Sequence, residues 1–167
     1  MAKLIIIRGN SGSGKTTLTK GIRNKLPKDK TLIVSQDVIR REMLGVKDRK
    51  HNLSIKLIQQ IVAYGATHCE YVILEGILGK RIYQEMLTEI TELFAPNVLV
   101  YYFELPFEET LKRHQTRAQV NEFGPEMMEE WWLSNDCLGV KNEYKMNESQ
   151  NLDTLIDEII HNLMNLT

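Results

Sequence analysis

Residues 3–18 read Lys-Leu-Ile-Ile-Ile-Arg-Gly-Asn-Ser-Gly-Ser-Gly-Lys-Thr-Thr-Leu, and this stretch decides the fold. The apolar run over residues 4–7 predicts a buried strand. The next residues have the spacing Gly-x4-Gly-Lys-Thr, from Gly9 to Thr16, which is typical of a phosphate-binding loop between a strand and a helix. Leu18, Ile22 and Leu26 recur at helical spacing behind the loop, so the motif has the context that it requires.

The loop predicts a nucleotide triphosphate site. Its glycines let successive backbone N–H groups point inward, and the following helix adds the positive end of its dipole. In this motif Lys15 reaches the β- and γ-phosphates and the Thr16 hydroxyl ligates Mg²⁺, while Thr17 is a neighbour. The residues predicted to form the phosphate site are Gly9, Asn10, Ser11, Gly12, Ser13, Gly14, Lys15, Thr16 and Thr17. The alternative is a glycine-rich turn that binds nothing.

The composition points to a small partner. A chain of 167 residues is most simply one domain, 1–167, and can bury a real core. With 21 basic and 22 acidic residues the net charge is -1, so nucleic acid or an anionic membrane is not an expected partner. Cys69 and Cys137 lack zinc or disulfide spacing and are expected to be core thiols. No signal-peptide or membrane-spanning pattern is present, which predicts a cytoplasmic protein; the oligomeric state is left open.

Short apolar runs alternate with helical patterns. The runs that predict strands are 4–7, 31–34, 71–74, 98–103 and, more weakly, 143–146. The apolar stripes that predict helices lie within 53–62, 83–94, 107–118 and 152–163, the third made by Phe107, Leu111 and Ala118. This alternation predicts an α/β fold with a doubly wound parallel sheet, whose ligands sit at the carboxyl ends of the strands.

Asp37 is the candidate general base. It follows the second predicted strand and so should lie on the same sheet edge as the phosphate loop. Transfer of a phosphoryl group needs a group that accepts the proton of the attacking hydroxyl. The alternative is an acid favoured only by the dipole of the helix that it opens.

Glu75 ends the third predicted strand, next to Gly76, on that same edge. It is a candidate for holding a Mg²⁺-bound water or for orienting the acceptor, and the glycine would admit close approach. An aspartate is commoner in this metal-binding role. Glu104, at the end of the fourth strand, is a weaker rival, and the alternative for Glu75 is a carboxylate that merely caps a turn.

Arg113 and Arg117 lie four residues apart, after the fourth strand and before a polar stretch through Gly124. They predict a lid with arginines, which suit the charge that develops on a transferring phosphoryl group. Arg117, nearer the loop, is the stronger candidate. For Arg113 the alternative is a solvated helix face on which it pairs with Glu109.

A basic segment between the second and third strands is expected to cover the acceptor. Its cationic side chains and the histidine at its end are Arg40, Arg41, Lys47, Arg49, Lys50 and His51. Arg40 and Arg41 are candidate acceptor contacts, together with Asp37 and Glu75, and would favour an anionic acceptor. The alternative is an ordinary solvated charge run. Trp131 and Trp132 either stack on an acceptor ring or, the more common case, belong to the core.

The loop from Gly9 to Thr16, the acid Asp37 and the arginine lid together resemble the P-loop small-molecule kinases. This group includes adenylate, shikimate and uridine kinases, chloramphenicol phosphotransferase and zeta-toxin kinases. The resemblance implies a five-stranded parallel sheet in the order 2-3-1-4-5, a helical lid, and ATP with Mg²⁺ as donor. In the chloramphenicol and zeta-toxin relatives an acid at the position of Asp37 is the base. Glu75 replaces the usual aspartate, and the short lid carries no zinc cysteines.

Three functions therefore compete. A kinase that phosphorylates a hydroxyl of a nucleoside, sugar nucleotide or antibiotic is favoured over an ATP-hydrolysing switch or coupling module, and over a polynucleotide 5′-end kinase. A switch would hydrolyse ATP without an acceptor. An end kinase should carry a basic track with stacking aromatics, which a chain with 7% aromatic residues and a net charge of -1 does not obviously offer. The identity of the acceptor follows from no pattern in the sequence.

Overall fold

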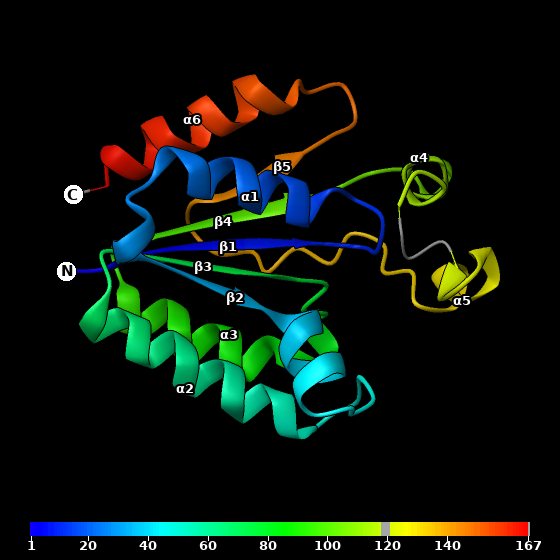
Figure 1. Ribbon diagram of the computed structural model, residues 1–167, viewed down its shortest axis with the longest axis horizontal. Coiled ribbons are helices and arrows are strands. Elements are labelled where there is room, and N and C mark those ends of the chain that lie inside the picture. Colours follow the sequence, from blue (N-terminus) through cyan, green and yellow to red (C-terminus); the bar gives the residue numbers. More distant parts are fainter. Residues whose placement is uncertain (118–120, 167) are drawn as a thin grey trace.

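The computed structural model describes residues 1–117 and 121–166. Its centre is a five-stranded sheet in the order β2-β3-β1-β4-β5, and every neighbouring pair is parallel. The strands are β1 (Lys3–Gly9), β2 (Thr31–Ser35), β3 (Tyr71–Gly76), β4 (Val98–Phe103) and β5 (Glu143–Met146). The predicted sheet and its order are confirmed, including the weak fifth strand at the edge beside β4 (Figure 1).

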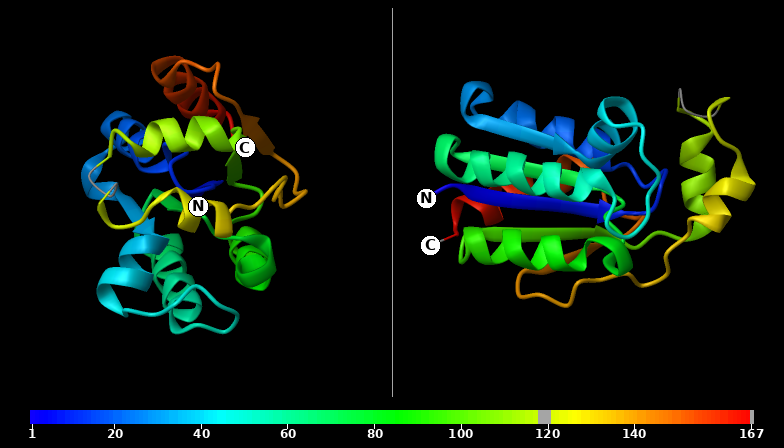
Figure 2. Two further views of the ribbon diagram at one scale, coloured as in Figure 1. Left: turned by 90° about the vertical axis from the view of Figure 1, so that its right-hand side faces the viewer. Right: turned by 90° about the horizontal axis from the view of Figure 1, so that it is seen from below.

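Helices cover both faces of this sheet. The α-helices are α1 (Lys15–Lys25), α2 (Leu53–His68), α3 (Lys80–Phe94), α4 (Phe107–His114), α5 (Pro125–Glu130) and α6 (Leu152–Met164). Short turns of other helix types follow α1 and β2, namely η1 (Lys28–Lys30) and the π-helical η2 (Val38–Met43). Figure 1 shows α1 and α6 on one face and α2 and α3 on the other. In Figure 2, α4 and α5 stand beyond the carboxyl ends of the strands. The described residues 107–117 and 121–132, which include both helices, are called the lid below.

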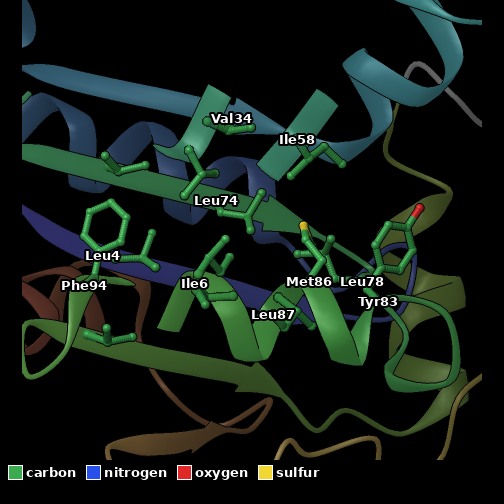
Figure 3. Close-up of a cluster of buried hydrophobic side chains, with 14 of the residues drawn as sticks. Leu4, Ile6, Val34, Ile58, Leu74, Leu78, Tyr83, Met86, Leu87 and Phe94 are labelled. Carbon is green, nitrogen blue, oxygen red and sulfur yellow. The ribbon is translucent and has the colours of Figure 1, made fainter. Parts of the chain in front are cut away.

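The core has two layers because the central strands are apolar on both sides. On β1, Leu4 and Ile6 pack toward α2 and α3, whereas Ile5 and Ile7 pack toward α1 and α6. All four side chains are fully buried, and each contributes about 1.5–3 kcal/mol relative to an exposed position. Figure 3 shows the first layer, in which Leu74 of β3 and Phe94 of α3 join Leu4 and Ile6.

Parallel pairing brings the candidate site residues to one edge. Ile7 is opposite Glu75, and Ser35 is opposite the same residue on the other side of β3. Gly9, where the phosphate loop begins, is opposite Phe103 at the end of β4. The loops after β1, β2, β3 and β4 therefore leave the sheet at the same level.

Two details differ from the sequence-based expectations. The helix α4 ends at His114, because the chain turns at Gln115, so Arg117 lies beyond the helix rather than on a shared face with Arg113. Ala118, assigned to the apolar stripe of that helix, lies outside the described residues. Cys69 and Cys137 are free thiols at partly exposed positions rather than fully buried ones.

In the described part of the chain, no helix combines the length and the apolar character that crossing a membrane requires.

Candidate functional site

The loop between β1 and α1 adopts a conformation that depends on its glycines. Gly9 has φ +150°, and a Cβ atom there would lie 2.8 Å from Cβ of Phe103. Gly12 has φ +78°, and its added Cβ would lie 2.6 Å from the carbonyl oxygen of Thr110. Larger residues would therefore clash at both positions and be strained as well. The turn leads through Gly14 directly into the first residue of α1, Lys15, so that the N-terminus of α1 faces the loop.

Lys15 is a buried cation at the centre of this loop. Its Nζ donates hydrogen bonds to the carbonyl oxygen of Asn10 (2.8 Å) and to Oγ of Ser13 (3.3 Å). Burial lowers the pKa of Lys15 to about 8, and the negative charges of Glu75 and Asp37 only partly oppose this shift. A buried ammonium group held by uncharged oxygens, beside the N-terminus of a helix, suits an anionic ligand such as a phosphate chain.

The remaining loop residues divide by where their side chains lie. Thr16 and Thr17 are exposed in the first turn of α1. Ser11 is partly exposed, whereas Ser13 is buried against Lys15. The side chain of Asn10 is also buried and turns away from Lys15 toward the chain after α5.

A cavity of about 320 Å³ opens beside the loop. Its walls include Gly14 and Thr17 from the loop and α1, Arg113 and Arg117 from the chain after β4, and Asn147 from the chain after β5. A larger groove of about 760 Å³ lies between α2 and α3, and the residues that line it include none of the phosphate loop. The smaller cavity is therefore the one continuous with the candidate phosphate site.

Asp37 directly precedes η2 and lies two residues after the end of β2. The side chain of Asp37 is 57% exposed and accepts a hydrogen bond from Nη2 of Arg40 at 3.2 Å. It makes no capping hydrogen bond to the backbone of η2, although its place before the first residue of η2 is also the one that the helix-dipole alternative requires. The negative charge of Asp37 raises the pKa of Lys15, against the larger effect of burial. The carboxylate is thus exposed to solvent at the side of the loop.

Glu75 is the buried acid of the site. One carboxylate oxygen accepts a hydrogen bond from Oγ of Ser35 at 2.6 Å. The charge of Glu75 raises the pKa of Lys15 more than that of Asp37 does. Glu104, the rival at the end of β4, instead forms an ion pair with Lys145 of β5 at 2.9 Å. Of the two strand-end glutamates, Glu75 is the one whose charge acts on Lys15.

Gly76 admits a close approach, but from within the protein. A Cβ atom at Gly76 would lie 2.4 Å from Oε1 of Gln36, so the side chain of Gln36 occupies this space. The same Oε1 accepts a hydrogen bond from the backbone N–H of Leu78 (3.0 Å), and Nε2 donates to the hydroxyl of Tyr83 (2.9 Å). The sequence interpretation missed Gln36. Its signal was a polar residue between a strand and the candidate base. Its effect is to join the chain after β2, which carries Asp37, to the loop after β3, which follows Glu75.

The two lid arginines occupy different positions. Arg113 donates from Nη1 to the carbonyl oxygen of Ser13 (2.9 Å) and from Nε to Glu109 (2.8 Å). The predicted Glu109–Arg113 pair therefore exists together with a contact to the phosphate loop. Arg117 lines the cavity, and its positive charge contributes to the lowered pKa of Lys15. The structure thus brings both arginines to the loop, although only Arg113 belongs to α4.

The basic segment is partly neutralised by nearby acids. Arg40 pairs with Asp37, and Arg41 pairs with Glu122 of the lid at 3.0 Å. Lys47, Arg49 and Lys50 are exposed. The core interpretation of the tryptophans is wrong for Trp131. Trp131 is 41% exposed and Trp132 is partly exposed, packed edge-on against Phe107 of the lid.

The sequence matches the AAA domain family over residues 4–130, which is most of the chain. No curated protein matches it. Among solved structures, a gluconokinase from Sinorhizobium meliloti 1021 superposes with a TM-score of 0.71 at 17% identity, covering 98% of this chain and 93% of the gluconokinase.

Two further structures resemble this chain over nearly their whole length. A tunicamycin resistance protein from Deinococcus radiodurans has a TM-score of 0.69 at 16% identity and covers 100% of this chain and 98% of its own. The APS kinase of Mycobacterium tuberculosis, in complex with AMPPNP and APS, has a TM-score of 0.64 at 13% identity, with 98% coverage of both chains. The chain therefore belongs to the AAA domain family, and its sheet, phosphate loop and helical lid form the fold of the P-loop small-molecule kinases.

Proposed function

We propose that the protein is an ATP-dependent kinase that transfers the γ-phosphoryl group to a hydroxyl of a small-molecule acceptor. One arrangement supports this proposal. The buried cation Lys15 lies at the end of a glycine loop, and the carboxylates of Asp37 and Glu75, near neighbouring strand ends, favour its charged form. Phosphoryl transfer requires positioning, charge compensation and a proton acceptor, and the residues at this edge of the sheet would supply all three. Residues 1–167 would form one kinase domain.

The donor would bind along the loop and the cavity beside it. Backbone N–H groups from Gly9 to Thr16 and the ammonium group of Lys15 would hold the phosphates. The cavity of about 320 Å³ would receive the nucleoside part, because it adjoins the loop at Gly14 and Thr17.

The oxygen donors near the loop fit a magnesium ion. The exposed hydroxyl of Thr16 and the carboxylate of Glu75 are hard oxygen ligands of the kind that Mg²⁺ prefers, Glu75 acting directly or through a water. When bound, Mg²⁺ neutralises charge on the phosphate oxygens during transfer.

Asp37 would accept the proton of the acceptor hydroxyl as its oxygen attacks phosphorus. Its carboxylate is exposed, so an acceptor could reach it, and it pairs with Arg40 at 3.2 Å. Gln36 fixes the loop next to it through Leu78 and Tyr83. These contacts would restrict the movement of the base, which favours general base catalysis.

A screen for acceptor-dependent ADP release tests the proposal. The purified protein would be incubated with ATP, Mg²⁺ and panels of nucleosides, nucleotides, sugars, and aminocyclitol or phenylpropanoid antibiotics, and phosphorylated products would be identified by mass spectrometry. ADP release that requires one of these hydroxyl compounds is the expected result. ATP hydrolysis without any acceptor dependence would favour the switch, and phosphorylation of oligonucleotide 5′ ends would favour the end kinase.

Replacing Arg117 by alanine is expected to lower kcat by about 10²-fold and to change the affinity for ATP much less. The reason is that charge on the transferring phosphoryl group is greatest in the transition state, when the lid is closed. Steady-state kinetics and nucleotide titration measure the two effects. Lys112→Ala, at an exposed position of α4, is the matched control. A loss confined to thermal stability would show that Arg117 is structural.

The affinity for an anionic acceptor is expected to fall as salt is added, because the basic segment is exposed. Arg49→Glu should raise the acceptor KM, and Arg41→Glu should do so too, although this second change also breaks the pair with Glu122. The KM for ATP should remain nearly unchanged in both variants. Lys20→Glu, exposed on α1, controls for net charge. An acceptor KM that ignores salt would indicate a neutral acceptor and a merely solvated charge run.

A further inference from the structure

One residue of the phosphate loop, Asn10, directs its side chain to the chain that follows the lid. Asn10 is buried, and its Nδ2 donates a hydrogen bond to the carbonyl oxygen of Leu133 at 2.7 Å. The backbone N–H of Leu133 donates in return to Oδ1 of Asn10 at 2.9 Å. The side-chain amide of Asn10 thus binds both the backbone N–H and the backbone carbonyl of Leu133, which lies 123 residues away in the sequence. Such a reciprocal pair fixes the distance and the orientation of the two segments.

The lid helices touch the neighbouring residues of the same loop. Arg113 of α4 donates to the carbonyl oxygen of Ser13, and the absent Cβ of Gly12 leaves the space in which the carbonyl of Thr110 lies. Cε of Met128, from α5, lies 3.3 Å from that same Cβ position. The loop is therefore in contact with α4, with α5 and, through Asn10, with the chain that follows α5.

The chain after the lid is fixed again three residues further on. Arg8, fully buried at the end of β1, donates from Nη1 to the carbonyl oxygen of Asp136 and from Nη2 to its carboxylate, each at 2.7 Å. The backbone N–H of Lys80 donates to the same carboxylate at 2.9 Å. Asp136 is therefore part of the rigid body of the sheet. Leu133 lies between α5 and this anchor. Its contact with Asn10 is therefore the attachment to the rigid body that lies nearest to the end of α5.

From these contacts we infer that Asn10 is a positioning residue, whose amide holds the lid in register with the phosphate loop so that Arg113 and Arg117 face the phosphates. The part that concerns phosphates rests on the proposed function. The part that concerns the lid does not, since it follows from the contacts within the chain. Without the amide, Leu133 would lose both of its partners and α5 could shift relative to the loop.

The first test needs no substrate, because the chain carries its own probes. Both of its tryptophans, Trp131 and Trp132, lie in the lid next to Leu133. Asn10→Ala should raise the rate constant for quenching of their fluorescence by acrylamide, since a loosened lid exposes them. Asn52→Ala is the matched control. Asn52 also donates to a backbone oxygen (Arg49, 2.8 Å) and accepts from a backbone N–H (Ser54, 3.0 Å), but it lies at the start of α2.

The second test is a double-mutant cycle on kcat. Asn10→Ala alone should reduce kcat about tenfold or more, because misplacement of catalytic groups by about an ångström is enough for such a loss. In the Arg117→Ala background the same change should cost clearly less, because one of the two arginines that it positions is already gone. Asn10→Ala combined with Asp37→Asn should instead show multiplied losses.

Two results would overturn the inference. The first is unchanged quenching in Asn10→Ala, and the second is a loss that multiplies fully with that of Arg117→Ala. Asn10→Asp should act in the same direction as Asn10→Ala, because it keeps the size of the side chain but sets an acceptor against the carbonyl of Leu133, and it serves if the alanine variant is unstable. Absence of kinase activity in the unmodified protein, with increased quenching in the variants, would count against the proposed function alone.

Discussion

Lys15→Ala is expected to lower kcat by about 10³-fold or more while the protein stays folded. The change removes the cation that lies buried in the phosphate loop, and preorganised charge beside a developing anion is one of the strongest sources of catalysis. The fold should persist because the substitution also removes a buried charge, whose desolvation is costly. Steady-state kinetics and circular dichroism measure the two results. Lys20→Ala, at an exposed position of α1, is the control for loss of a lysine.

The pKa of Lys15 adds a pH dependence to this prediction. Because burial lowers the pKa to about 8, the ammonium form of the free protein predominates below that pH and is lost above it. The value of kcat/KM for ATP, which reports the free enzyme, should therefore fall as the pH rises through about 8. Bound phosphates favour the charged lysine, so kcat at saturating ATP should fall at a higher pH. A folded Lys15→Ala variant with full turnover would refute the phosphate-loop assignment.

The fold was largely predictable because its signals are local. The run over residues 4–7, the loop to Thr16 and the alternation of apolar runs with helical stripes define β1, the loop and the order of elements along the chain. The order of strands in space came from the resemblance to P-loop kinases, and the sheet confirms it. The end of α4 was misplaced, since Arg113 and Arg117 have helical spacing although the chain turns at Gln115.

The contacts around the site were less predictable because they join distant segments. Glu109 and Arg113 form the expected pair, four residues apart on one helix. By contrast, no local pattern links Asn10 with Leu133 or Gln36 with Tyr83. Arg8 gave a weak signal, a charge within an apolar strand, and its partner Asp136 lies 128 residues away. Strand-end residues such as Glu75 were found because parallel strands bring their carboxyl ends together, which is a property of the fold rather than of the residues.

Asp37→Asn is expected to lower kcat by about 10² to 10⁴-fold, with little effect on binding of ATP, because the amide cannot accept the proton of the acceptor hydroxyl. The substitution keeps the size of the side chain, and the carboxylate is exposed, so the fold should not change. Two other roles make different predictions. A cap would show wild-type turnover, and a ligand of the metal would show weaker binding of ATP and Mg²⁺ with turnover intact at saturation.

The ion pair with Arg40 provides the control that separates catalysis from loss of that contact. Arg40→Gln removes the partner at 3.2 Å but leaves the carboxylate of Asp37 in place. If Asp37 is the base, Arg40→Gln should raise the acceptor KM and retain most of kcat, whereas Asp37→Asn should lose kcat. If both variants lose kcat equally, the pair matters as a unit and Asp37 has no separate role in proton transfer. Initial rates measured over a matrix of ATP and acceptor concentrations distinguish these outcomes, since they give kcat and both KM values for each variant.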